Sequence, residues 1–134
     1  MAVLDKLLKI IEEYTLKLDE INDVDDWITY QATLHMLQVQ AQALIDLIRR
    51  LLSNMGIATD SYRESVKKLF ENKLVAEEEF HFLNSVVSFR NILVYVYATV
   101  NQDVVRKIIK ERSYRRLLKI AINLKKRAEK YWDP

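Results

Sequence analysis

The stretch from Asn84 to Val100 reads NSVVSFRNILVYVYATV, and Arg90 is its only charged residue. Residues 77–79, just before it, are three glutamates, and acidic side chains favour the N-terminal end of a helix dipole. Neither glycine nor proline interrupts the segment. It therefore predicts a helix over about residues 76–99 that is apolar on most of its surface.

Two further helices are expected before this stretch, over about residues 2–21 and 26–55, because apolar side chains recur there at helical spacing. Gly56, the only glycine, stands where a left-handed C-terminal cap would end the second helix. Ser61 and Glu64 have the spacing of a capping box that opens a short third helix. The residues that this third helix is expected to bury are Val66, Leu69 and Phe70.

After the central stretch, Asn101 is placed to cap a fifth helix that buries Val104 and bends near Ser113. The 134 residues include one glycine and one proline, too few for a fold rich in tight turns. The sequence therefore predicts one domain over residues 1–134. We expect it to be an all-α, antiparallel up-and-down bundle of about five helices.

Composition argues against several kinds of site. The chain has no cysteine, which excludes disulfides, thiolate metal sites and cysteine nucleophiles. Its two histidines, His35 and His81, are too few for a multi-histidine metal site. The glutamates at 77–79 point about 100° apart around a helix, so they do not converge on one ion. With a single glycine there is no phosphate-binding Gly-rich loop, and we expect neither a metal nor a cofactor.

The start of the chain has no apolar secretory core, and no apolar run approaches the roughly 20 residues that span a bilayer. A cytoplasmic protein without a membrane is therefore expected. Residues 104–130 contain eleven basic side chains against two acidic ones. Such a stretch can attract phosphate or an acidic partner, or it can be the solvated face of a helix.

Arg90 needs a partner, because an arginine buried without one costs several kcal/mol. A carboxylate, backbone carbonyls, a subunit interface or a bound anion could supply it. On a continuous helix Tyr97 returns to within about 20° of Arg90, while Asn91 and Tyr95 form an i,i+4 pair on an adjacent face. The spacing thus predicts a polar strip on an apolar helix, although tyrosines so spaced are commonly core or interface residues.

The eight residues RNILVYVY, from Arg90 to Tyr97, resemble the signature of the HepT-like branch of the HEPN family. That signature is Arg-Asn, three mostly apolar residues, His, any residue and Tyr. The resemblance extends to LQVQAQALID at residues 37–46 and to residues 61–74 and 101–109, and so covers about residues 26–124. It implies a HEPN-like fold and a metal-independent ribonuclease with two motifs facing each other across a homodimer.

The resemblance also implies roles for single residues. Arg90 would hold the scissile phosphate of RNA, with Asn91 and Tyr95 at the other catalytic positions. The family's partner is a cognate nucleotidyltransferase that neutralises the toxin, in some cases by attaching AMP to the motif tyrosine, which corresponds to Tyr97. Tyr95, however, stands where the family has its catalytic histidine. A phenol titrates near pH 10 and an imidazole near pH 6.5, so tyrosine is the poorer base at neutral pH.

Neither remaining histidine replaces the missing one. His81 is nine residues before Arg90, roughly 13 Å away along a straight helix and on another face. His35 could approach only through tertiary packing. Three explanations of Tyr95 remain open: a natural loss of activity, an engineered inactivating substitution or a different use of the site.

Two other interpretations remain open at this stage. In the first, the chain is a non-catalytic binding module that docks a nucleotidyltransferase or binds a nucleotide. In the second, it is a purely structural bundle in which Arg90 pairs with a glutamate at 77–79 or with an acid of the first helix.

Overall fold

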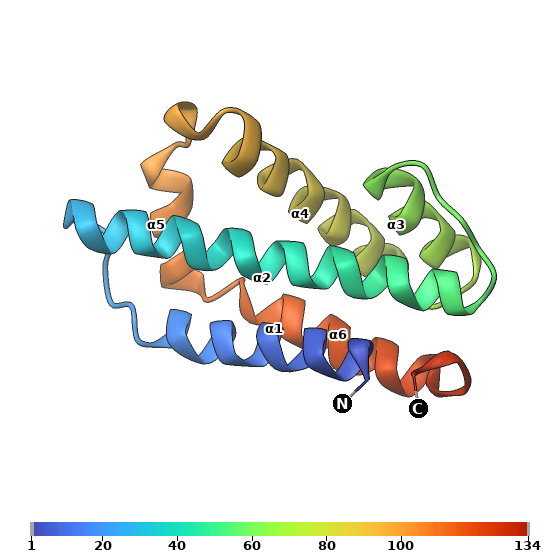
Figure 1. The fold of residues 1–134 in the computed structure, drawn as a ribbon. Helices are drawn as coiled ribbons and strands as arrows, with labels where there is room; N and C mark the ends of the chain where they lie inside the picture. The colour runs from blue at the N-terminus through green and yellow to red at the C-terminus, as the bar shows by residue number, and fades with distance from the viewer. Residues whose placement is uncertain (1, 134) are drawn as a thin grey trace.

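The longest helix, α2 (Trp27–Asn54), is the centre of the fold. The computed structural model describes residues 2–133, and in Figure 1 α2 runs across the middle of the molecule. It packs against α1 (Val3–Asp19) and α6 (Arg115–Arg127) on one side and against α3 (Tyr62–Glu71) and α4 (Glu77–Tyr95) on the other. Together with α5 (Gln102–Glu111) these are six helices, and residues 2–133 contain no strand, which confirms the predicted all-α fold.

The predicted caps are largely confirmed. Gly56 has a φ of +80°, in the left-handed region that favours glycine, just after the end of α2. The Ser61 hydroxyl accepts a hydrogen bond from the backbone N–H of Glu64 at 3.0 Å. The Glu64 carboxylate accepts from the backbone N–H of Asp60, one residue earlier than a capping box requires. Only half of the box is therefore formed.

Two clusters of buried side chains make up the core. The larger joins α2 to α1, α3, α4 and α6, and the smaller lies where α2, α4 and α5 meet the loop after α1. Two residues predicted to be buried are not. Phe70 is 38% exposed and stacks on Phe80, with ring centroids 4.7 Å apart, and Val104 is 48% exposed. Both lie beside an apolar stripe rather than in it.

The predicted fifth helix is two helices, which is why the bundle has six rather than about five. Arg112 has a φ of +55° after α5, and the chain restarts as α6 at Arg115. Contacts distant in sequence hold this break, because Asp19 of α1 accepts hydrogen bonds from Arg112, Tyr114 and Arg115. The hydrogen bond from Arg115 is the largest influence that lowers the pKa of the Asp19 carboxyl below its usual value.

Gln40 of α2 fixes the same break from inside the core. Its side-chain amide is 1% exposed and donates to the Thr15 hydroxyl at 2.9 Å and to the Tyr114 carbonyl at 3.0 Å. One side chain thus joins α1, α2 and the start of α6. The Tyr114 carbonyl also accepts from the backbone N–H of Leu117 at 3.2 Å, so the bond from Gln40 ties the first turn of α6 to α2.

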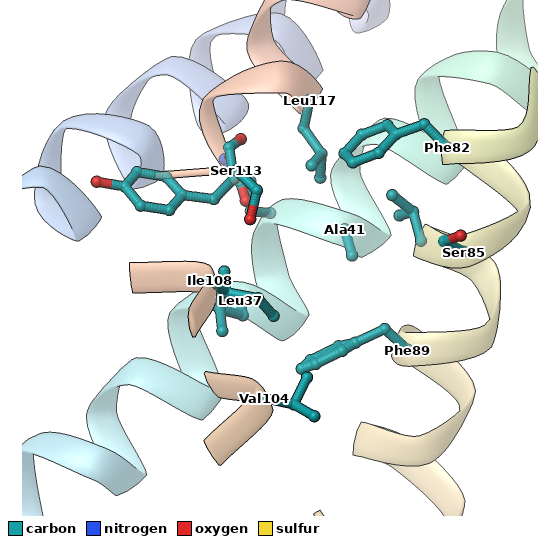
Figure 2. A pocket seen from close by; sticks show the side chains of 12 residues that line it. Leu37, Ala41, Phe82, Ser85, Phe89, Val104, Ile108, Ser113 and Leu117 are labelled. Carbon is teal, nitrogen blue, oxygen red and sulfur yellow. The ribbon is translucent and has the colours of Figure 1, made fainter. Parts of the chain in front are cut away.

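An apolar cavity of about 300 Å³ lies beside Gln40, between α2, α4, α5 and α6. Figure 2 shows Phe82 and Phe89 extending into it from α4, opposite Leu37 and Ala41 of α2. Neither Arg90 nor either tyrosine of the predicted polar strip lines it. This apolar pocket is therefore separate from the predicted site. Among residues 2–133, no helix has both the length and the apolar character needed to cross a membrane.

Candidate functional site

The end of α4 differs from the prediction and decides where the site residues lie. The helix ends at Tyr95, not near Thr99, and residues 97–99 form a separate 3-10 turn. Val96 leaves the helical conformation with φ −133° and ψ 43°, and both the N–H and the hydroxyl of Thr99 donate to its carbonyl. β-Branched and aromatic residues fill this end of the helix, and their low helix propensity favours the early stop.

The polar strip is therefore divided. Arg90, Asn91 and Tyr95 lie together on α4 and line one groove, whereas Tyr97 lies outside it on the 3-10 turn. The predicted alignment of Tyr97 with Arg90 fails, because that alignment assumed a continuous helix. The hydroxyl of Tyr97 instead donates to the side-chain oxygen of Gln31 on α2.

Neutral amides hold Arg90 in place. Its Nε donates to Oε1 of Gln42 at 2.8 Å, and its Nη1 donates to Oδ1 of Asn91 at 3.2 Å. The other end of the Gln42 amide donates to Oδ1 of Asp46 at 2.8 Å. The guanidinium is thus oriented by a chain of hydrogen bonds that ends on a carboxylate, but no carboxylate within residues 2–133 forms an ion pair with it.

The acids proposed as structural partners of Arg90 are engaged elsewhere. Oxygens of Glu77, Glu78 and Glu79 lie 3.5, 3.2 and 2.7 Å from nitrogens of His81, Arg116 and Arg127, respectively. In the first helix, Asp5 pairs with Lys125 and Asp19 with Arg112 and Arg115. The prediction that Arg90 pairs with a glutamate at 77–79 or with an acid of the first helix is therefore wrong.

Tyr62 of α3 organises the space around Arg90. The guanidinium carbon of Arg90 lies 5.0 Å from the centre of the Tyr62 ring, and that of Arg49 lies 5.5 Å from it. Such cation–π contacts hold long side chains in defined positions. The ring lies in an open groove of about 520 Å³, which we call the Arg90 groove. Its lining residues are Arg49, Asp60, Ser61, Tyr62, Arg63, Val87, Arg90, Asn91 and Tyr95.

Sequence reasoning missed Arg49, Tyr62 and Arg63. The only sequence signal was that Arg49 and Gln42 are seven residues apart, and therefore lie on one face of a helix. No local pattern connects α3 with that face. Only the packing of α3 beside α2 and α4 brings these side chains to Arg90.

The two phenols have different surroundings. The Tyr95 ring is 76% exposed and lies 5.8 Å from the Arg90 guanidinium carbon. Tyr97 is 41% exposed, and its hydroxyl is engaged with Gln31. Its neighbour Tyr30 is more enclosed, and burial, with a smaller effect of Tyr97, raises the pKa of Tyr30.

No histidine reaches the groove. His81 pairs with Glu77 one turn earlier on α4, and His35 is exposed on α2. Within residues 2–133, no three histidine, aspartate or glutamate side chains are arranged to hold a metal ion. The groove therefore offers an oriented guanidinium, an amide and a phenol, a combination that can bind a phosphate group.

Comparison with protein families gives one match. The family described as "Ribonuclease HepT-like" matches residues 4–124, nearly the whole chain. No curated protein is significantly similar to the chain.

Solved structures share the fold at low sequence identity. YutE of Bacillus subtilis, a cytosolic protein of unknown function, aligns with a TM-score of 0.83 and 19% identity over 98% of this chain and 92% of its own. A tri-AMPylated HEPN toxin of Shewanella oneidensis, in complex with an MNT antitoxin, aligns with a TM-score of 0.77 and 18% identity. The alignment covers 90% of this chain and 96% of the toxin. A chain of a toxin–antitoxin structure with AMP-PNP aligns with a TM-score of 0.79 and 18% identity, over 90% of this chain and 98% of its own length. These similarities confirm the HEPN-like architecture.

Proposed function

The chain belongs to the HepT-like ribonuclease family, and from this membership we propose that it is the toxin of a toxin–antitoxin pair. Its RNA site would lie where two copies of the chain meet, and it would work without a metal ion or a cofactor. A nucleotidyltransferase is the proposed antitoxin. One of the solved structures with a similar fold is a HEPN toxin in complex with an MNT antitoxin. The similarity to a cytosolic protein supports a cytoplasmic location.

One observation carries the proposal: Arg90 is oriented by Gln42 and Asn91 but not neutralised, and it faces an open groove. A guanidinium can donate two parallel hydrogen bonds to the oxygens of one phosphate. The Nη groups keep donors available for this purpose, because Nε makes the contact to Gln42 and only one contact is made through Nη1. Arg90 is therefore the proposed ligand of the scissile phosphate.

The surface of the last turn of α4 supports a homodimer. Ile92, Val94 and Val96 are 41, 36 and 49% exposed around the end of α4, and Tyr95 between them in sequence is exposed as well. Large apolar side chains left exposed so close together can mark a protein interface. In the proposed dimer a second copy would cover part of this surface, with its Arg90 near that of the first.

Tyr95 limits the chemistry that this site can perform. Cleavage of RNA requires a group that takes and returns protons near neutral pH, and a phenol is a poor one. We therefore propose that ribonuclease activity is weak or absent in the chain as it stands. The same residue favours a second candidate function, a non-catalytic module that docks the nucleotidyltransferase or binds a nucleotide.

Replacing Tyr95 with histidine tests the ribonuclease assignment. We expect the Tyr95→His protein to cleave RNA at least about a hundredfold faster than the unaltered chain, since general acid–base catalysis contributes about 10²–10⁴ in rate. The measurement is the initial rate of cleavage of labelled RNA. Tyr95→Phe is the matched control, and it should stay as slow as the unaltered chain. A histidine variant that stays inert, yet binds the nucleotidyltransferase normally, would show that the ribonuclease assignment is wrong.

Tyr97 is the proposed acceptor of AMP from the partner. In that reaction the phenol oxygen bonds to the α-phosphorus of ATP, pyrophosphate leaves, and the phenol proton passes to solvent or to a base of the partner. The hydroxyl lies on an exposed turn and has only Gln31 as a partner among the described residues. It can therefore be reached without unfolding a helix.

We expect incubation with the nucleotidyltransferase and ATP to raise the mass of the chain by one or more AMP groups. The Tyr97→Phe protein should gain none at this position, because it lacks the nucleophile. Tyr95→Phe, which removes the neighbouring exposed phenol, should be modified as the unaltered chain is. Intact-protein mass spectrometry measures all three, and modification that persists in Tyr97→Phe but disappears in Tyr95→Phe would assign the acceptor to Tyr95.

A further inference from the structure

The arginines of this chain fall into two groups by the partners they contact. Within residues 2–133, six of the nine form ion pairs with carboxylates: Arg50, Arg106, Arg112, Arg115, Arg116 and Arg127. The other three, Arg49, Arg63 and Arg90, form none. All three line the Arg90 groove. The unneutralised guanidinium groups are thus gathered at one place, although they come from three different helices.

Each of these arginines is nevertheless held in position by neutral groups. Arg49 donates to the backbone carbonyl of Thr59 at 3.3 Å, and Arg63 donates to the hydroxyl of Ser88 on α4. The Tyr62 ring lies within 5.5 Å of the Arg49 guanidinium and within 5.0 Å of that of Arg90. The guanidinium carbons of Arg49 and Arg90 are therefore separated by no more than the sum of these two distances. Neighbouring phosphates of one strand can contact two guanidinium groups at such a separation.

The groove carries a clear excess of positive charge. Asp60 is the only acidic residue that lines it, against three arginines. Like charges so close together repel, and a bound anion removes that repulsion. This arrangement suits a ligand with more than one negative charge.

We propose that Arg49, which lies beside the Tyr62 ring, and Arg63, which lines the same groove, form a second phosphate-binding subsite beside Arg90. This subsite binds the phosphate next to the scissile one. Single-stranded RNA would then lie along the groove, with consecutive phosphates bound by Arg90 and by the subsite. This inference rests on the proposed function and deepens it by naming the form of the substrate. The exposed Tyr95 ring favours RNA over an acidic protein, because basic grooves with exposed aromatic rings are characteristic of single-strand binding, in which bases stack on the rings.

The test measures RNA binding by the unaltered chain, which is expected to bind RNA with little cleavage. The probe is a fluorescein-labelled single-stranded RNA of about twelve nucleotides, followed by fluorescence anisotropy at several salt concentrations. Arg49→Gln and Arg63→Gln should each weaken binding about tenfold, the typical effect of losing a charge-assisted hydrogen bond. Each should also reduce the slope of log K against log salt by about 0.7, the contribution of one phosphate contact on a single strand.

Arg50→Gln is the matched control. Arg50 is the next residue along α2 and carries the same charge, but it pairs with Asp133 outside the groove. Its replacement should leave both the affinity and the salt slope nearly unchanged. Thermal melting of all variants checks that the fold is kept.

The outcomes separate the subsite from the function on which it rests. If Tyr95→His cleaves RNA, but Arg49→Gln and Arg63→Gln bind RNA with the affinity and salt slope of the Arg50→Gln control, the subsite is wrong and the ribonuclease assignment stands. If these variants keep RNA binding and lose the nucleotidyltransferase, the groove is a docking surface for an acidic protein, which also overturns the subsite. If neither cleavage nor RNA binding is found in any variant, both proposals fail.

Discussion

RNA cleavage by the Tyr95→His protein is expected to fall by about 10²–10³-fold when Arg90 is replaced with alanine. The alanine removes the donors proposed to bind the scissile phosphate, and loss of one such donor to a developing charge has effects of this size in other enzymes. Arg90→Lys should recover part of the loss, because lysine restores the charge but not the planar fork that holds two oxygens. Single-turnover rates on labelled RNA measure both variants.

Arg90 also contacts Gln42 and Tyr62, so its replacement can disturb the fold as well as the site. Light scattering and thermal melting are therefore run on the same samples, and we expect two-chain particles with melting temperatures close to that of the parent. Arg116→Ala is the control. Arg116 pairs with Glu78 and lies over the Phe82 ring outside the groove, so its loss should leave cleavage within about threefold of the parent. An Arg90→Ala variant that cleaves as fast as this control would contradict the phosphate role.

The same substitution in the unaltered chain distinguishes the two candidate functions. RNA affinity that drops sharply on Arg90→Ala favours the RNA-directed toxin. Binding of ATP or AMP without any binding of RNA, together with an unaffected complex with the nucleotidyltransferase, favours the non-catalytic module. Titration of the purified protein with ATP, AMP and short RNA gives the answer.

The second large effect is on stability and concerns Gln40. Gln40→Ala should lower the free energy of unfolding by about 2–5 kcal/mol, because it truncates a buried side chain and removes its two hydrogen bonds, to the Thr15 hydroxyl and to the Tyr114 carbonyl. It also enlarges the cavity that Gln40 already lines. Urea unfolding followed by circular dichroism measures the loss.

Gln38→Ala is the control for this experiment. Gln38 is the same residue type on the same helix, but it is only half-buried and makes no side-chain hydrogen bond within residues 2–133. Its replacement should change the free energy of unfolding by less than about 0.5 kcal/mol. Equal losses for Gln38→Ala and Gln40→Ala would mean that the hydrogen bonds to Thr15 and Tyr114 contribute little to stability.

Features of the fold that depend on neighbours in sequence were predictable. Helical spacing located α1, α2 and α3 to within a few residues, and Gly56 and Ser61 identified the end of one helix and the start of another. Such signals come from backbone conformation and from hydrogen bonds that span three or four residues, and both can be read in a short window.

Features that depend on tertiary contacts were not predictable. The break between α5 and α6 is held by Asp19 and Gln40, which lie more than 70 residues away in sequence. Arg90 and Asn91 were identified by a local motif, whereas Arg49 and Arg63 join them only after three helices have packed. A motif search therefore finds the centre of the site and not its surroundings.

The early end of α4 has a consequence for control of the protein. Tyr95 is the last residue of the helix that carries Arg90, while Tyr97 belongs to a short turn that follows a break at Val96. An adduct on Tyr97, the proposed AMP acceptor, would extend from this turn and not from the helix that carries Arg90. The proposed AMP acceptor and the position of the missing histidine thus lie on different backbone segments, although only one residue separates the two phenols in the chain.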